Sequence, residues 1–326
     1  MHSKRQFDHL TLCSPSGALI NPQQLDQAIT VLQTYCLPIV EQNNVRSRFQ
    51  RFAGTDSERI QAIEMACCLR QSSLILATRG GYGMSRLLPQ LHLEKLVQSL
   101  NHYQHVLCGH SDITALQLAL LSAGAQPETL LHGPMACFDF GDSLGIHPDT
   151  EHWFSQAVFN NTVHIQWQAP VFNPQSSLGE TSNELLNSIV GPAWGGNLTM
   201  LTSLLGTPWL PNIRGGILIL EDVNESAYKI ERMLLQLVYA GVLTSQQVVL
   251  MGNFSEPSPH PHDHGYCLSE VFRYLNKQHN VRILTHFPFG HVQPKSCWFQ
   301  GCPAELTIQA VSDDLLNCTL RQCIQC

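Results

Sequence analysis

Charged side chains are scarce in this chain of 326 residues. Asp, Glu, Lys and Arg make up 13% of it, and the formal net charge is −7. No run of lysine and arginine is long enough to follow a phosphate backbone, which argues against nucleic acid as a partner. No stretch approaches the roughly 18 apolar residues of a membrane span. The beginning, MHSKRQFDHLTLCSPSG, also lacks the apolar core of a signal peptide. These absences predict a cytoplasmic protein with neither a nucleic-acid nor a membrane partner.

Cysteine is not scarce, yet its pattern does not indicate disulfides. The 12 cysteines are scattered, several within apolar runs such as EMACCL, so we expect reduced and mostly buried thiols. The ending CTLRQCIQC holds one CxxC, without a second pair at matching spacing. In SPHPHDHG, His260, His262 and His264 alternate and could bind a metal if extended, but a flexible proline-rich surface loop is the simpler reading. We therefore expect no metal and no cofactor.

The first half alternates strand and helix patterns. HLTLCSPSG and SSLILATRGGYG are apolar runs that end in turns, and a helical stretch covers about Pro22 to Cys36. Thr55 and Glu58 have the spacing of a capping box, so we expect a helix to begin there. A further strand, HVLCGHSD, leads into the helix ITALQLALLSAG. Strands that alternate with helices predict a doubly wound α/β domain with a mostly parallel sheet.

A polar, turn-rich segment, APVFNPQSSLGETSNELLN, then separates the first half from a second half with a different pattern. After it come short strands such as GILILEDVNE, QVVLMGNF and AELTIQA, with one strong helix, YKIERMLLQLVYAG. We therefore predict an N-terminal α/β domain over 1–168, a linker over 169–187, and a smaller strand-rich domain over 188–326. A length of 326 residues suits two domains.

Ser111 lies where the strand HVLCGHSD turns into a helix. Such a turn exposes a side chain and points free backbone N–H groups towards developing negative charge, as a nucleophile requires. His110 and Asp112 beside it have the wrong geometry for a triad, because neighbouring side chains of an extended strand point to opposite faces. The local sequence leaves two interpretations open, since serine is also a good N-cap.

Three other segments carry candidate chemistry. The glycine-rich ATRGGYGMSRLL could supply backbone N–H groups to a phosphate or an oxyanion, or could simply be a sharp turn. Glu221 and Asp222 end an apolar strand, where ligands gather in α/β proteins. His291 follows another apolar strand and directly follows Gly290. A solvated strand end and a surface histidine are the alternatives there.

Taken in order, these segments resemble the serine LD-carboxypeptidase family. The similarity covers nearly the whole chain, through SPSG, RFAGTDSER, RGGYGMSRLL, CGHSDITA, HGPM, WGGNLTMLTSLLGTPW, GILILEDVNE, ERMLLQL and FGH. It implies a flavodoxin- or amidotransferase-like N-terminal domain and a catalytic triad of Ser111, His291 and Glu221. The implied substrate is a murein tetrapeptide of bacterial cell-wall recycling, cut between diaminopimelate and the terminal D-Ala. The family also suggests a homodimer.

With this resemblance, the remaining candidate residues can be given expected roles. We expect backbone N–H groups of Gly81 and Asp112 to form the oxyanion hole. Substrate-binding candidates are Arg79, Tyr82, Arg86, Trp194, Asn197 and Arg232, and the sequence does not rank the arginines as partners of the terminal carboxylate. Two alternatives remain: a microcin-immunity-type serine peptidase, or a non-catalytic two-lobed ligand-binding protein, which would be expected to lack a triad residue.

Overall fold

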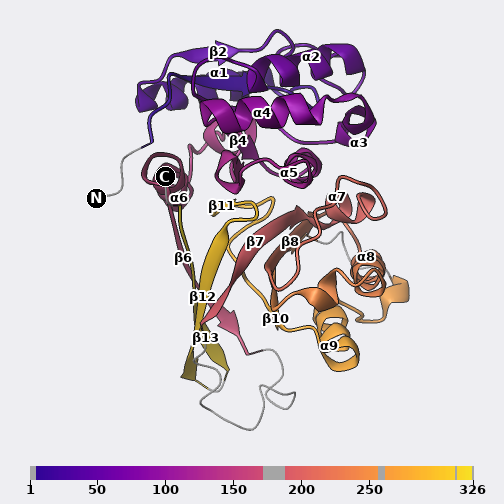
Figure 1. Cartoon of the computed structure of the whole chain (residues 1–326). Helices are drawn as coiled ribbons and strands as arrows, with labels where there is room; N and C mark the ends of the chain where they lie inside the picture. Colours follow the sequence, from indigo (N-terminus) through magenta and orange to yellow (C-terminus); the bar gives the residue numbers. More distant parts are fainter. Residues whose placement is uncertain (1–4, 172–187, 256–260, 313, 325–326) are drawn as a thin grey trace.

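The computed structural model describes residues 5–171, 188–255, 261–312 and 314–324. Two sheets organise these residues, one in each domain, with the first domain at the top of Figure 1 and the second below it. The strand order is β11-β5-β4-β3-β1-β2 in the first sheet and β10-β9-β8-β7-β12-β13-β6 in the second. The predicted α/β class, with a parallel N-terminal sheet and a strand-rich second domain, is confirmed.

The first sheet is parallel from β1 to β5, and only β11 runs antiparallel, against β5. Its strands are β1 (His9–Cys13), β2 (Ile39–Glu41), β3 (Ser73–Ala77), β4 (Val106–Gly109), β5 (Leu130–His132) and β11 (Trp298–Phe299). The helices of this domain are α1 (Pro22–Leu32), α2 (Asp56–Cys67), α3 (Met84–Leu87), α4 (Leu93–Tyr103), α5 (Ile113–Ser122) and α6 (Pro148–Asn160).

The second sheet is parallel over β10, β9, β8 and β7 and antiparallel over β7, β12, β13 and β6. Its strands are β6 (Thr162–Pro170), β7 (Ile189–Asn197), β8 (Ile217–Val223), β9 (Val248–Ser255), β10 (Ile283–Leu284), β12 (Pro303–Ser312) and β13 (Leu315–Cys323). The helices are α7 (Leu198–Ser203), α8 (Ala227–Tyr239) and α9 (Leu268–His279).

Local sequence accounts for several of these elements. Helix α2 begins with the predicted capping box, in which Thr55 and Glu58 each bond the other's backbone N–H. Successive residues of the buried strand β3 enter different apolar clusters: Leu74 and Leu76 pack with α1, whereas Ile75 packs with α2, α4 and α5. Both faces of the first sheet are therefore covered, as an apolar strand without alternation predicts.

The predicted domain boundary needs correction. Strand β6 pairs with β13 over its whole length, so the second sheet already includes residues from Thr162 onwards, and Ala169 and Pro170 are strand rather than linker. In the other direction, Trp298 and Phe299 cross back to join the first sheet. The rest of the predicted linker, 172–187, lies outside the described residues. The second domain thus begins before residue 169, and the chain later returns once to the first sheet.

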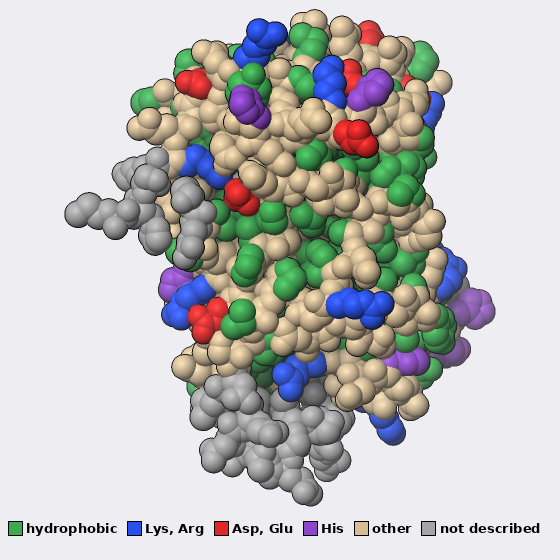
Figure 2. Space-filling view, in the orientation of Figure 1, with side chains coloured by type: hydrophobic (Ala, Val, Ile, Leu, Met, Phe, Trp, Pro, Cys, Tyr) green, Lys and Arg blue, Asp and Glu red, His purple; other side chains and the backbone are tan. Residues whose placement is uncertain are grey.

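Apolar side chains fill the space between and around the sheets. Figure 2 shows hydrophobic side chains gathered across the middle of the face in view. Both large buried clusters contain residues from each domain, for example Leu118 of α5 with Leu201 of α7. Among the described residues, no helix combines the length and apolarity that crossing a bilayer requires.

Candidate active site

Ser111 occupies a sharp turn between β4 and α5. Its φ is +62°, in the left-handed region that non-glycine residues rarely adopt. The glycine loop packs directly against it, since a Cβ on Gly80 would lie 2.7 Å from the Ser111 Cβ. The cap of α5 is Asp112, without a side-chain cap hydrogen bond, so the structure does not support the N-cap interpretation of Ser111. Ser111 instead follows the end of a strand, and 9% of the residue is exposed.

The two neighbours of Ser111 serve other partners. Asp112 is fully buried and accepts hydrogen bonds from the Ser16 hydroxyl (2.6 Å) and the Met84 N–H (2.9 Å), which ties the glycine loop to the turn. Burial raises the pKa of this carboxyl. The His110 side chain points into the first domain, where its Nδ1 lies 2.9 Å from the Gly133 carbonyl. Neither side chain is available as a base for Ser111.

Glu221 and His291 form a hydrogen-bonded pair in the second domain. His291 Nδ1 lies 2.9 Å from Glu221 Oε2, and the carboxylate is fully buried on β8. The other carboxylate oxygen accepts a hydrogen bond of 3.1 Å from the Asn197 side-chain amide. Both carboxylate oxygens thus have a partner, which fixes the orientation of the acid and leaves His291 Nε2 as the ring nitrogen that can face another group.

Strand β9 determines where His291 stands. The backbone N–H of Asn253 donates to the Phe289 carbonyl at 2.7 Å, and a Cβ on Gly252 would lie 2.5 Å from that same oxygen. Gly290 has a φ of +146°, with the Asn253 Cβ within 2.9 Å of where its own Cβ would be. The close approach of the two backbones therefore requires glycine at both positions.

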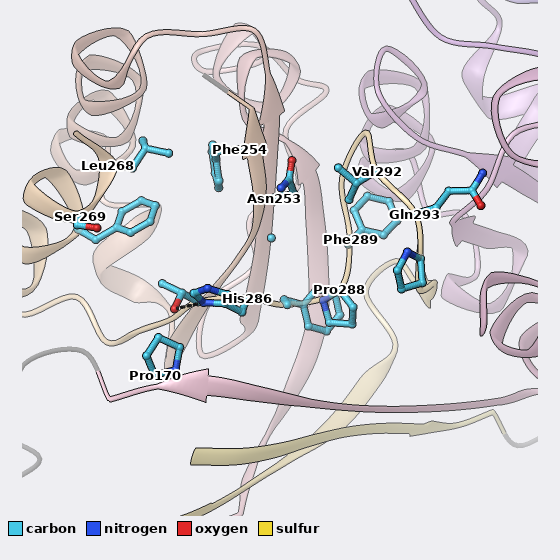
Figure 3. A pocket seen from close by; sticks show the side chains of 15 residues that line it. Pro170, Asn253, Phe254, Leu268, Ser269, His286, Pro288, Phe289, Val292 and Gln293 are labelled. Carbon is cyan, nitrogen blue, oxygen red and sulfur yellow. Dashed lines mark hydrogen bonds between the residues drawn. The ribbon is translucent and has the colours of Figure 1, made fainter. Parts of the chain in front are cut away.

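A cavity of about 400 Å³ lies against the same loop. Residues on both sides of His291 in the chain line it, and Figure 3 shows Phe254 and Leu268 across the cavity from Phe289 and Val292. His291 itself is not among the lining residues. This larger cavity shares no lining residue with the cavity of Ser111 and is therefore separate from it.

Ser111 and His291 line one small cavity of about 120 Å³. Three segments of the first domain complete its wall, namely the beginning of α1 with the residues before it, the glycine loop, and the segment that follows β5. The residues are Ile20, Gln24, Arg79, Gly80, Gly81, Ser111, Met135, Cys137, Phe138 and His291. Among the described residues the Ser111 hydroxyl has no hydrogen-bond partner. A hydrogen bond between a nucleophile and its base is often long or absent until substrate binds, so this does not exclude Ser111 as a nucleophile. The cavity is the place where the two domains bring a hydroxyl and an imidazole together.

Of the two predicted oxyanion donors, only Gly81 is a lining residue of the cavity. Gly81 lines the cavity with a φ of +109°, and Asp112 follows Ser111 at the start of α5. Tyr82 is 43% exposed and lines a neighbouring cavity rather than this one.

Two of the predicted substrate-binding residues, Trp194 and Asn197, are buried. Trp194 is fully buried in the apolar core, and its indole N–H donates to Gln246 at 3.1 Å. Asn197 is 5% exposed, with its amide on Glu221 and its carbonyl capping α7 through the Met200 N–H. Neither lines the cavity of Ser111, and the Asn197 amide instead holds the Glu221 carboxylate.

Two of the three candidate arginines also lie away from the cavity. Arg86 forms an ion pair with Asp56 at 2.8 Å and stacks on Phe52. Arg232 is an exposed residue of α8. Arg79 alone of the three lines the cavity of Ser111, so the structure ranks the arginines where the sequence could not.

Sequence reasoning missed a buried cation behind the site. Lys295 is fully buried, with its Nζ 3.0 Å from an Asp139 oxygen and 2.9 Å from His110 Nε2. Because Lys295 donates to Nε2, the His110 proton is on Nδ1, and burial lowers the pKa of this imidazole well below its ordinary value. The His110 and His291 rings meet edge to face, 5.3 Å between centroids. A lone lysine in QPKSC carries no motif that could have revealed this pairing.

The three histidines considered as metal ligands lie only partly within the described residues. His260 lies outside the described residues, whereas His262 and His264 lie within them. Across 5–171, 188–255, 261–312 and 314–324, no group of three His, Cys, Asp or Glu side chains could hold a metal ion.

The fold and this site define a two-domain α/β protein in which a serine of one domain and a glutamate-bound histidine of the other line one cavity. The chain belongs to the LD-carboxypeptidase family: the model of its N-terminal domain matches residues 10–131, and that of its C-terminal domain matches residues 190–306.

Individual relatives agree with this family over nearly their whole length. A putative carboxypeptidase of Synechocystis is 31% identical over 92% of this chain and 91% of its own. The murein tetrapeptide carboxypeptidase of Pseudomonas aeruginosa is 27% identical, covering 91% of this chain and 92% of its own. The crystal structure of a muramoyltetrapeptide carboxypeptidase from Oxalobacter formigenes superposes with a TM-score of 0.82 and 31% identity, over 96% of this chain and 98% of that one.

Proposed function

We propose that this protein is a serine carboxypeptidase that removes the terminal D-Ala from murein tetrapeptides. The bond cleaved joins the L-centre of diaminopimelate to D-Ala. One observation carries the proposal: a serine in a left-handed turn and His291, which is hydrogen-bonded to the buried Glu221, line the same small cavity. The names of the relatives in Pseudomonas and Oxalobacter support the choice of substrate.

The geometry suggests a role for each residue. Since the His291 Nδ1 proton is held by Glu221, Nε2 is free to take the hydroxyl proton of Ser111 as its oxygen attacks the scissile carbonyl. Glu221 stabilises the imidazolium that results. His291 then returns the proton to the leaving D-Ala amine, and water hydrolyses the acyl-enzyme by the same route.

Negative charge develops on the carbonyl oxygen during the attack. The N–H groups of Gly81 and Asp112 are the donors we assign to it, because Gly81 lines the cavity and Asp112, the N-cap of α5, directly follows Ser111. A non-catalytic binding protein would not be expected to retain all three residues of the triad, and here they are all present.

The test is to incubate the protein with the tetrapeptide L-Ala-D-Glu-diaminopimelate-D-Ala and with an analogue that ends in L-Ala. We expect mass spectrometry to detect release of alanine from the peptide that ends in D-Ala and not from the analogue that ends in L-Ala. We expect Ser111→Ala to lower kcat at least about a thousand-fold. Release from neither peptide, or full activity of Ser111→Ala, would reject the proposal. Cleavage of a peptidyl-nucleotide in place of the tetrapeptide would favour the microcin-immunity alternative.

A further inference from the structure

A second cavity, of about 330 Å³, adjoins the cavity of Ser111. The two have wall residues in common, namely Ile20, Arg79 and Gly81. The second cavity, hereafter the arginine cavity, is lined by Gly17, Ala18, Leu19, Ile20, Arg48, Arg51, Arg79, Gly81 and Tyr82. A group bound there would lie next to a peptide bond held at Ser111.

Three guanidinium groups face the arginine cavity. Arg79 is half-buried and donates to the Ala18 carbonyl at 2.7 Å, while Arg48 donates to the Leu19 carbonyl. The Arg51 guanidinium lies over the Tyr82 ring, 5.5 Å from its centroid. Burial, and after it repulsion from the Arg51 and Arg48 charges, lowers the pKa of Arg79.

These three arginines differ from their neighbours in having no acidic partner. Arg46 pairs with Asp26 at 2.8 Å, and both Arg59 and Arg86 pair with Asp56. Among the described residues, no Asp or Glu carboxylate forms an ion pair with the three cations of the arginine cavity. Cations held close together without a counter-charge attract an anion, because its binding relieves their mutual repulsion.

We propose that Arg48, Arg51 and Arg79 form the subsite that binds the free terminal carboxylate of the substrate and thereby limits cleavage to the last residue. This inference rests on the proposed function and adds to it the basis of its exopeptidase specificity. Neither Arg48 nor Arg51 was a candidate from the sequence.

The position of the subsite suits a terminal carboxylate. In a peptide the carboxylate is one residue beyond the scissile carbonyl, and Arg79 is the arginine that lines both the Ser111 cavity and the arginine cavity. A guanidinium binds a carboxylate through two parallel hydrogen bonds, which gives direction as well as charge. Arg48 and Arg51 add positive potential behind it. A polypeptide that continues past the scissile bond would present no charge to them.

The experiment compares two substrates, the tetrapeptide with its free carboxylate and the same peptide with a terminal carboxamide. We expect wild-type kcat/KM to be about 10- to 100-fold lower for the carboxamide, since a charge-assisted bidentate contact is lost. In Arg79→Ala and Arg51→Ala, kcat/KM for the carboxylate should fall towards the value for the carboxamide. The ratio between the two substrates is the decisive quantity, because a misfolded variant would lose both activities alike.

Arg46→Ala is the matched control, because Arg46 belongs to the same segment but pairs with Asp26 outside the cavity. It should keep the wild-type ratio. Ser111→Ala provides a measurement without turnover: calorimetry should find that the tetrapeptide binds it more tightly than the carboxamide does, and that adding Arg51→Ala removes the difference. An unchanged ratio in both Arg79→Ala and Arg51→Ala would overturn the inference.

Failure of the proposed function gives a different result. If the wild type releases nothing from the tetrapeptide, the proposed reaction is wrong, whereas the subsite is still tested by titration with N-acetyl-D-alanine and its amide. The subsite predicts that the acid binds the wild type, that the amide does not, and that Arg51→Ala weakens binding of the acid. Equal binding of acid and amide would overturn it independently of turnover.

Discussion

At the residue scale, the environment of Ser111 is unusual in two ways. Its φ of +62° is a conformation that costs a non-glycine residue about 1–3 kcal/mol unless the surroundings hold it. Those surroundings are polar and buried: Asp112 is fixed by Ser16 and Met84, and His110 by Lys295 and Gly133. The residues on either side of Ser111 thus hold the turn, which explains why polar residues flank it.

Lys295 is the residue whose removal should show this most clearly. We expect Lys295→Met to lower the free energy of unfolding by about 3–5 kcal/mol, because it leaves the buried Asp139 carboxylate without its counter-charge. Chemical denaturation of the variant and the wild type at pH 7 measures the loss.

A second substitution separates this cause from simple loss of packing. Asp139→Asn keeps an acceptor for the Met135 N–H but removes the negative charge. Added to Lys295→Met, it should restore part of the stability, through a coupling within the range of about 0.5–3 kcal/mol found for interacting pairs. Strictly additive losses would contradict the ion-pair explanation.

Residues differ in how far the sequence could predict them. Ser111 and Glu221 lie at strand ends, positions that an apolar run followed by polar residues identifies. The pairing of Lys295 with Asp139 joins positions 156 residues apart and has no local signal. Arg51 lies in the turn between the bridged residues Phe49 and Phe52, and Arg48 comes directly before them, where no periodicity indicates which way a side chain faces.

At the scale of elements, the loop after β10 depends on β9. Gly252→Ala should push the Phe289 carbonyl away, because the new methyl carbon would lie 2.5 Å from that oxygen and strand backbone cannot yield cheaply. His291 lies two residues further along, so we expect kcat to fall about 10- to 100-fold with little change in KM, as for a misplacement of roughly 1 Å.

Steady-state kinetics on the tetrapeptide checks this prediction, with Gly241→Ala as a comparison. Gly241 has a φ of +72° but open space around its Cβ position, so its substitution tests backbone strain at a distance from the loop. A rise in KM with unchanged kcat in Gly252→Ala would show that the loop binds substrate and does not position His291.

Strand β6 shows where pattern reading of an element went wrong. TVHIQWQAP alternates buried and exposed residues along its whole length, which is the pattern of a half-buried antiparallel strand. The predicted boundary at 168 followed the change in composition downstream and ignored this alternation. Strand β11, with two residues, is too short for any periodicity, and only its pairing with β5 defines it.

At the scale of the whole molecule, the candidate site exists only where the domains meet. Ser111 belongs to the first domain, and Glu221 and His291 belong to the second. Polar contacts fix the junction: the Asn197 N–H donates to Thr114 of α5 at 3.1 Å, and Gln300 bonds both backbone groups of Gly195. A Cβ on Gly196 would lie 2.6 Å from the His132 ring, so the domains approach as closely as glycine permits. No single stretch of sequence contains the information for this arrangement.

Stability should depend on pH through three buried histidines. Burial is the first cause in each case: it lowers the pKa of His105 to about 4, that of His132 to about 3, and that of His110 well below its ordinary value. The unfolded chain takes up these protons near pH 6.5, whereas the folded protein does so only at lower pH. The unfolded state therefore binds more protons below pH 6.5, and acid shifts the equilibrium towards it.

As the pH falls from 6.5 to about 4, we expect each of these histidines to lower the free energy of unfolding by about 1.4 kcal/mol per pH unit. Asp112 and Asp222 act in the opposite direction near their own, raised pKa values, because the folded state then takes up their protons first. Urea unfolding at pH 7.5, 6.5, 5.5 and 4.5 measures the net slope, which we expect to be flat above pH 6.5 and steep below it. His152→Gln, at an exposed position of α6, should leave the slope unchanged. A free energy of unfolding that stays constant from pH 7 to 5 would mean that His105, His110 and His132 accept protons in the folded protein. Protonation would break two hydrogen bonds to ring nitrogens, the one that Lys295 donates to His110 and the one that the Ser73 N–H donates to His105.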